Sequence, residues 1–137
     1  VLAAFCQGTS RLAGVGRLAN KESDRAKAIL EMLTQMGVRA CVEGDEMVIE
    51  GHSLAQRLLS GAASDNLATG AAAAGQAGEA PGLLRGGRYT SHHDHRMVMA
   101  LKVASLGADS PIEIDDEDCV AKSFPQFNAL FACAVSC

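Results

Sequence analysis

Three short polar clusters interrupt or begin otherwise apolar stretches of this 137-residue chain: Lys21–Arg25, His92–Arg96 and Lys122–Ser123. In the first two, an arginine lies where the first turn of a helix is expected. The unpaired N–H groups and positive dipole of such a turn already favour an anion. A guanidinium adds a planar fork that holds phosphate or carboxylate with two hydrogen bonds. If the three clusters converge, their cations surround one small, highly charged ligand.

Glu22 is the carboxylate of this constellation. Nearby cations such as Lys21, Arg25 and Lys122 would set its proton affinity and suit it to acid–base chemistry. The alternative is that the acidic residues only complement a helix dipole while the cations are solvated surface charges. One cluster alone favours that alternative, whereas three clusters at matching boundaries favour an anion site.

The second cluster also raises a metal hypothesis, because it places His92, His93 and His95 beside Asp94. Imidazole and carboxylate are ordinary ligands of zinc and similar ions. Neighbouring residues of an extended segment point to opposite faces, so at most two of the three imidazoles would converge without a turn. The preferred interpretation is that a histidine orients an anion or donates a proton near neutral pH, with no metal bound.

Composition argues against several other classes of protein. A net charge of −4, one Tyr, four Phe and no Trp do not fit a nucleic-acid surface, which needs a basic stripe with aromatic platforms. No apolar run approaches the roughly 20 residues that cross a bilayer. The five cysteines are odd in number and lack CxxC spacing, which favours reduced thiols. We therefore expect a cytoplasmic protein with no membrane contact, and the start at Val1 suggests a piece of a longer chain.

The first cluster leads into a segment with helical periodicity. Apolar residues recur at helical spacing from Ala26 to Met36, and Gly37 stands where a left-handed C-cap is expected, which predicts a helix over 22–36. Two β-branched runs, 38–42 and 47–49, follow and predict a hairpin with its turn at 43–46.

The second and third clusters lie among similar elements. The sequence predicts a strand over 87–91, a helix from about Met97 that ends at Gly107, and a strand over 112–114. Pro125 suits the first turn of a final helix whose apolar side carries Phe127, Leu130 and Phe131. Each half thus contains a helix, a glycine and a strand, a hint of internal repetition that favours a layered α/β architecture. The Ala/Gly-rich segment 60–82 is too poor in large apolar residues to offset its ordering entropy and is expected to be a mobile loop.

At these same residues the sequence resembles the 5-enolpyruvylshikimate-3-phosphate synthase (3-phosphoshikimate 1-carboxyvinyltransferase) family. The resemblance rests on Lys21–Arg25, on Asp94–Met97 with the small-apolar helix that follows, and on Lys122–Pro125. Their order and approximate spacing match the last three signatures of that family. Two positions depart from its pattern: Ala19 stands where an arginine is usual, and Arg17 where a polar substrate contact is common.

The resemblance implies transfer of the enolpyruvyl group of phosphoenolpyruvate to the 5-hydroxyl of shikimate 3-phosphate, with release of phosphate and without metal or organic cofactor. It assigns phosphoenolpyruvate binding to Arg25, Arg96 and Lys122, and His95 is grouped with them. It assigns the shikimate-phosphate side to Lys21 and proton transfer at the methylene carbon to Glu22.

The implied fold is an inside-out α/β barrel lobe built from βαβαββ units, of which residues 1–137 would form a late part. The opposite lobe and a general-base aspartate would lie upstream, so the isolated chain is expected to be inactive. Two alternatives remain: a related enolpyruvyl transferase that acts on a UDP-linked amino sugar, disfavoured by Lys21–Arg25, and a noncatalytic anion- or metal-binding module that uses the histidines.

Overall fold

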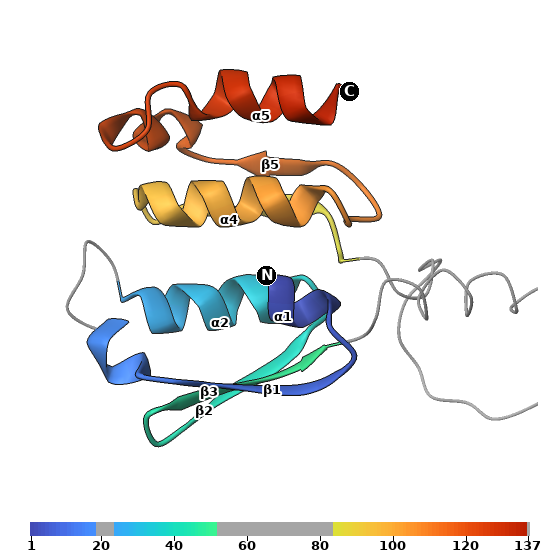
Figure 1. Ribbon diagram of the computed structural model, residues 1–137, viewed down its shortest axis with the longest axis vertical. Coiled ribbons are helices and arrows are strands. Elements are labelled where there is room, and N and C mark those ends of the chain that lie inside the picture. The colour runs from blue at the N-terminus through green and yellow to red at the C-terminus, as the bar shows by residue number, and fades with distance from the viewer. Residues whose placement is uncertain (19–23, 52–83, 137) are drawn as a thin grey trace, which may run out of the picture.

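Two parallel helices lie side by side, one against a three-stranded sheet and the other against a strand of a two-stranded sheet (Figure 1). The computed structural model describes residues 1–18, 24–51 and 84–136. Lys21, Glu22 and the Ala/Gly-rich segment 60–82 lie outside the described residues. No helix within the described ranges is long and apolar enough to span a bilayer.

The first half of the chain forms a three-stranded sheet covered on one face by a helix. Its elements are α1 (Leu2–Phe5), β1 (Gly8–Ala13), η1 (Val15–Leu18), α2 (Arg25–Gln35), β2 (Arg39–Glu43) and β3 (Glu46–Gly51). The strand order is β1-β3-β2, and β3 is antiparallel to both neighbours. Strands β1 and β2 therefore run in the same direction, α2 connects them, and β3 fills the gap between them.

The predicted helix and hairpin are confirmed, with changed bounds. Helix α2 begins at Arg25 rather than at Glu22, because Asp24 has the non-helical dihedrals of an N-cap and its carboxylate accepts from the Lys27 N–H. The hairpin turn shortens to Gly44-Asp45, and Gly44 adopts the left-handed φ of +63° that a tight turn requires. Gly37, with φ of +79°, follows α2 as predicted.

Strand β1 was not predicted from the sequence. Its residues are small or polar except for Leu12, and they are mostly exposed, so they lack the alternation that identifies a half-buried strand. Pairing with β3 determines where β1 lies, and in this register Ser10 is opposite Ile49.

The second half of the chain is a strand–helix–strand unit followed by a helical C-terminal segment. Its elements are β4 (Gly87–Tyr89), α4 (His95–Ser105), β5 (Ile112–Ile114), η2 (Glu117–Lys122) and α5 (Phe127–Val135). Strands β4 and β5 pair in parallel, with Tyr89 opposite Ile114, and α4 is the crossover between them. The predicted strand 87–91 is two residues too long, because Thr90 and Ser91 belong to the loop before α4.

The final helix differs from its prediction in its start and in how it packs. It begins at Phe127 with Gln126 as N-cap, so Pro125 precedes the helix and does not lie in its first turn. Phe127 and Phe131 are half-buried, and their rings stack with centroids 5.8 Å apart. Leu130, predicted on the same apolar side, is 55% exposed, and no residue of α5 is fully buried. Of the three apolar residues predicted to pack, only Phe127 and Phe131 are therefore partly buried.

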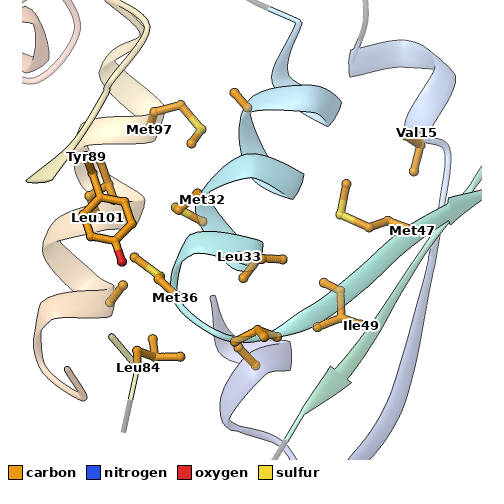
Figure 2. Packing of buried hydrophobic residues seen from close by; sticks show 14 residues of the cluster. Val15, Met32, Leu33, Met36, Met47, Ile49, Leu84, Tyr89, Met97 and Leu101 are labelled. Atoms are coloured by element: carbon orange, nitrogen blue, oxygen red, sulfur yellow. The ribbon is translucent and has the colours of Figure 1, made fainter. Parts of the chain in front are cut away.

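One apolar core joins the two halves, with α2 at its centre. Leu33 faces Met47 and Ile49 of β3, while Met32 and Met36 face the second half, where Met97, Leu101 and Tyr89 lie (Figure 2). A fully buried side chain of this size contributes about 1.5–3 kcal/mol. Since α2 is buried on both sides, it fixes the position of α4 relative to the first sheet.

Candidate functional site

The N-terminal ends of α2 and α4 lie at the same end of the molecule, and η2 lies at that end too (Figure 1). The first two polar clusters lie at the starts of α2 and α4, and the third, Lys122–Ser123, lies at the end of η2. Parallel helices bring two positive dipole ends together, which favours binding of an anion.

Arg25 and Asp94 form an ion pair that connects the first cluster to the second. Arg25 Nε donates to Asp94 Oδ2 at 2.5 Å, and Nη2 donates to Oδ1 at 3.1 Å. Arg25 is 8% exposed and Asp94 is completely buried. This two-point contact is the strong geometry for a guanidinium and a carboxylate. Arg25 was expected to bind a substrate, and in this structure its fork holds a carboxylate of the chain itself.

The same carboxylate is the N-cap of α4. Asp94 Oδ1 accepts from the Arg96 N–H at 2.9 Å, which satisfies one of the free N–H groups of the first turn. Arg96 is exposed and His95 is half-buried. Asp94 therefore fixes the start of the helix that presents both predicted anion-binding side chains.

Hydrogen bonds hold the loop before α4 against the residue that follows β5. Asp115, directly after β5, accepts from the Ser91 N–H at 2.8 Å and from the Ser91 hydroxyl at 3.0 Å. Hydrogen bonds from the Ser91 N–H and then from the Thr90 hydroxyl lower the pKa of Asp115 to about 2. The carboxylate is therefore ionised at any physiological pH.

The first two histidines of the cluster point to different partners. His92 Nε2 lies 3.3 Å from Glu31 of α2, and His93 Nδ1 lies 2.6 Å from Asp116. Among the described residues, no group of three or more His, Cys, Asp or Glu side chains is placed to hold a metal ion. The two histidines join the loop to α2 and to the segment after β5.

Lys122 is the last residue of η2, and its side chain is exposed. Element η2 packs on α4 through the buried residues Cys119 and Val120, which contact Val98. Burial raises the pKa of the Cys119 thiol, with Asp116, Lys122 and Asp94 all within electrostatic range. The third cluster is thereby held next to the second.

Of the six site residues expected from the sequence, the structure describes Arg25, His95, Arg96 and Lys122, and it gathers their elements at one end of the molecule. Sequence reasoning missed that Asp94 would pair with Arg25 and cap α4, and that Asp115 would hold the loop before α4. The available signals were an Asp directly before a helical segment for Asp94, and a carboxylate directly after a short strand for Asp115.

The three-stranded sheet has a shallow depression on the face that points away from α2. A depression of about 140 Å³ there is lined by Arg39, Ala40, Cys41, Val48 and Glu50. Arg39 pairs with Glu50 at 3.6 Å, and Arg11 contacts Glu43 at 2.9 Å. These exposed cross-strand pairs are typical of a solvated sheet face.

Comparison with known proteins agrees with the motifs. A sequence model of the family described as EPSP synthase (3-phosphoshikimate 1-carboxyvinyltransferase) matches residues 1–130. The chain belongs to the EPSP synthase family. Among curated EPSP synthases, that of Rhodopseudomonas palustris (strain BisA53) is 35% identical over 127 residues and that of Methylobacterium radiotolerans is 38% identical over 127 residues.

A solved structure shows the same relationship in three dimensions. An EPSP synthase from Acinetobacter baumannii matches 93% of this chain with a TM-score of 0.69 and 31% sequence identity. The match covers 24% of that chain, and the two curated relatives are each covered over 22% of their length. The mixed α/β fold described above is thus part of the EPSP synthase fold, and the chain spans between a fifth and a quarter of these relatives.

Proposed function

We propose that this chain supplies part of the site at which EPSP synthase transfers the enolpyruvyl group of phosphoenolpyruvate to the 5-hydroxyl of shikimate 3-phosphate. The observation that carries the proposal is the placement of Arg25, Arg96 and Lys122 on three elements whose relevant ends lie at the same end of the molecule. Two helix N-termini and three cations there suit a small ligand that bears both a carboxylate and a phosphate.

Each predicted site residue has a role in this proposal. Arg96 and Lys122, both exposed, bind phosphoenolpyruvate directly, and His95 orients it from the first turn of α4. Arg25, held at the start of α2 by its ion pair with Asp94, is assigned to phosphoenolpyruvate binding as well. Lys21 and Glu22, which precede α2 in the sequence, are assigned to the shikimate-phosphate side and to proton transfer.

The chemistry requires no metal or organic cofactor. The 5-hydroxyl oxygen adds to C2 of the enolpyruvyl group while Glu22 protonates the methylene carbon, and a base outside this chain takes the hydroxyl proton. Removal of a methyl proton by Glu22 then re-forms the double bond as the bond from C2 to the phosphate oxygen breaks. Fixed cations stabilise the negative charge of the departing phosphate, which is the main contribution that a preorganised site makes.

The remaining contacts belong to the rest of the enzyme. We infer that the chain forms the later part of one inside-out α/β barrel lobe of βαβαββ units, and that it is inactive without the opposite lobe. Some large apolar side chains of this chain are exposed, such as Leu106 at 60% and Leu130 at 55%. The rest of the enzyme would cover such side chains.

The experiment is reconstitution with the complementary portion of a related EPSP synthase, followed by assay of phosphate release from phosphoenolpyruvate and shikimate 3-phosphate. Arg96→Ala and Glu22→Gln are each expected to lower kcat/KM by a factor of about 100 or more. Arg88→Ala, which removes an exposed arginine from β4, is the matched control and should leave activity unchanged.

Activity that requires both pieces and falls only in the two site variants supports the proposal. A folded complex with no activity, or with equal activity in Arg96→Ala and Arg88→Ala, contradicts it.

A further inference from the structure

Two carboxylates that directly follow β5 fasten the loop between β4 and α4. Strands β4 and β5 are parallel neighbours, so the segments that leave Tyr89 and Ile114 emerge at the same edge of the sheet. There Asp115 Oδ1 accepts two hydrogen bonds from Ser91, through its backbone N–H and its hydroxyl. Asp116 Oδ2 lies 2.6 Å from His93 Nδ1.

The fastened loop has an unfavourable backbone. His92 and His93 are consecutive residues with φ of +52° and +55°, in the left-handed region that residues other than glycine rarely adopt. Such a conformation persists only where its surroundings over-determine it. The hydrogen bonds to Ser91 on one side and the His93–Asp116 pair on the other supply that restraint.

The left-handed pair decides where Asp94 lies. Within the turn, the Asp94 N–H donates to the Ser91 carbonyl at 3.0 Å, and the His93 N–H donates to the Ser91 hydroxyl at 3.3 Å. Ser91 and Asp94 are both completely buried. A chain of contacts therefore runs from Asp115 through Ser91 to Asp94, whose carboxylate holds both Arg25 and the first turn of α4.

We propose that Asp115 is a positioning residue: by holding Ser91 it keeps the left-handed turn closed, so that Asp94 orients the guanidinium of Arg25 and the helix start that carries Arg96. Asp115 acts through Ser91, whose backbone N–H and hydroxyl both donate to its carboxylate. The contacts among Asp115, Ser91 and Asp94 are features of the structure. The proposal rests on the proposed function only for the identity of the ligand that the arginines would bind. Because the pKa of Asp115 is lowered to about 2, the restraint is present throughout the neutral range.

The first test uses this chain and needs no substrate. Solvent exchange of the Arg25 Nε–H, measured by NMR, reports directly on the contact with Asp94. In Asp115→Ala we expect this exchange to become about tenfold faster or more, because hydrogen bonds to a charged group are lost from the restraint. The amides of Met32 and Leu33 in the core of α2 should keep their protection, which separates a local change from unfolding.

Two further variants sharpen that result. Asp115→Asn keeps an acceptor oxygen without the charge, so its Arg25 exchange should lie between the wild type and Asp115→Ala. Glu113→Ala removes an exposed carboxylate from β5 and should leave the exchange unchanged. Unchanged exchange in a folded Asp115→Ala overturns the proposal; if that variant does not fold, unchanged exchange in Asp115→Asn does so.

The second test uses the reconstituted enzyme. Asp115→Ala should raise KM for phosphoenolpyruvate about tenfold and change kcat less, because the anion-binding groups are misplaced before chemistry begins. Glu113→Ala should leave both constants unchanged. An inactive wild-type complex counts against the proposed function and leaves the NMR result to decide the role of Asp115. An active wild type with an unchanged KM in Asp115→Ala overturns the positioning role.

Discussion

A buried ion pair is the residue-scale feature on which the candidate site depends. Asp94 is completely buried and Arg25 nearly so, and each would be unfavourable in that position without the other. The pair links the start of α2 to the start of α4, which are 69 residues apart in the sequence when measured from Arg25 to Asp94. It therefore determines how the two helix N-termini lie relative to each other.

Asp94→Asn is predicted to destabilise the chain by about 3–5 kcal/mol, because it leaves the Arg25 charge buried without its counter-charge. The amide still caps α4, so the loss is due to charge rather than to the missing cap. Urea unfolding measures the change.

The double variant Arg25→Met with Asp94→Asn should recover part of the loss, since the buried charge is then absent. A cost below about 1 kcal/mol for Asp94→Asn alone would show that the pair is solvated rather than buried.

The carboxylate of Asp115 predicts a dependence of stability on pH. Its pKa is about 2 in the folded chain and 3.8 ordinarily, so its contribution is complete above pH 3.8 and is lost as the pH falls through about 2. Other carboxylates titrate in this range, including Asp109, whose pKa is also lowered by the Gly86 N–H and the Ser110 hydroxyl.

The measurement is therefore the difference between the wild type and Asp115→Asn in free energy of unfolding, followed from pH 6 down to about pH 2. The wild type should be more stable at the upper end, and the difference should shrink toward zero as the pH approaches 2. A difference that stays constant over this range would mean that the Asp115 pKa is not lowered.

At the scale of elements, α2 and α4 are built alike. Each has 11 residues and an aspartate N-cap, and each is followed by a glycine. The glycines differ in purpose: Gly37 has a left-handed φ of +79°, whereas a Cβ on Gly107 would lie 2.5 Å from the Phe5 ring. The order of helix and glycine noticed in the sequence is thus present in both halves, and the structure adds an aspartate N-cap to each helix.

The exposed N-cap of α2 provides a milder test than the buried one of α4. Asp24→Ala should lower the free energy of unfolding by about 1 kcal/mol, because the Lys27 N–H loses its acceptor. Asp24→Ser, which keeps a capping oxygen, should cost much less in the same thermal or urea unfolding experiment. Equal stability of all three proteins would show that Asp24 does not cap the helix.

Helix α5 is expected to be the least stable helix of eight or more residues that the structure describes. It has nine residues and no fully buried side chain, and a helix that short is marginal in water without tertiary packing. Its amides should exchange with solvent much faster than those of α2 and α4 in the isolated chain. Protection of α5 equal to that of α4 would mean that it is covered, for example by a second copy.

At the scale of the whole molecule, the two halves should unfold together because they share one core. Leu101→Ala in α4 and Ile49→Ala in β3 should each cost about 2–5 kcal/mol. Both residues belong to the same buried cluster, so each variant should lower the midpoint of one common transition. Fluorescence and circular dichroism curves that separate into two transitions in either variant would contradict a single core.

Several elements follow from the sequence because their causes are local. Helical periodicity and the C-cap glycine Gly37 indicate α2, β-branched runs around Gly44-Asp45 indicate the hairpin, and the apolar helix that ends before Gly107 indicates α4. The three motifs also indicate the family without any coordinates, since their types and order are a property of the chain alone.

Strand β1 and the contacts of the site required tertiary structure. A strand of small polar residues is decided by pairing with β3 rather than by its own pattern. The sequence predicted Arg25 as a ligand-binding residue, and only the fold revealed that its guanidinium is held by Asp94. That contact, like the one between Asp115 and Ser91, joins residues from distant segments. Burial and parallel strand pairing bring such groups together, and neither is encoded in the spacing of a motif.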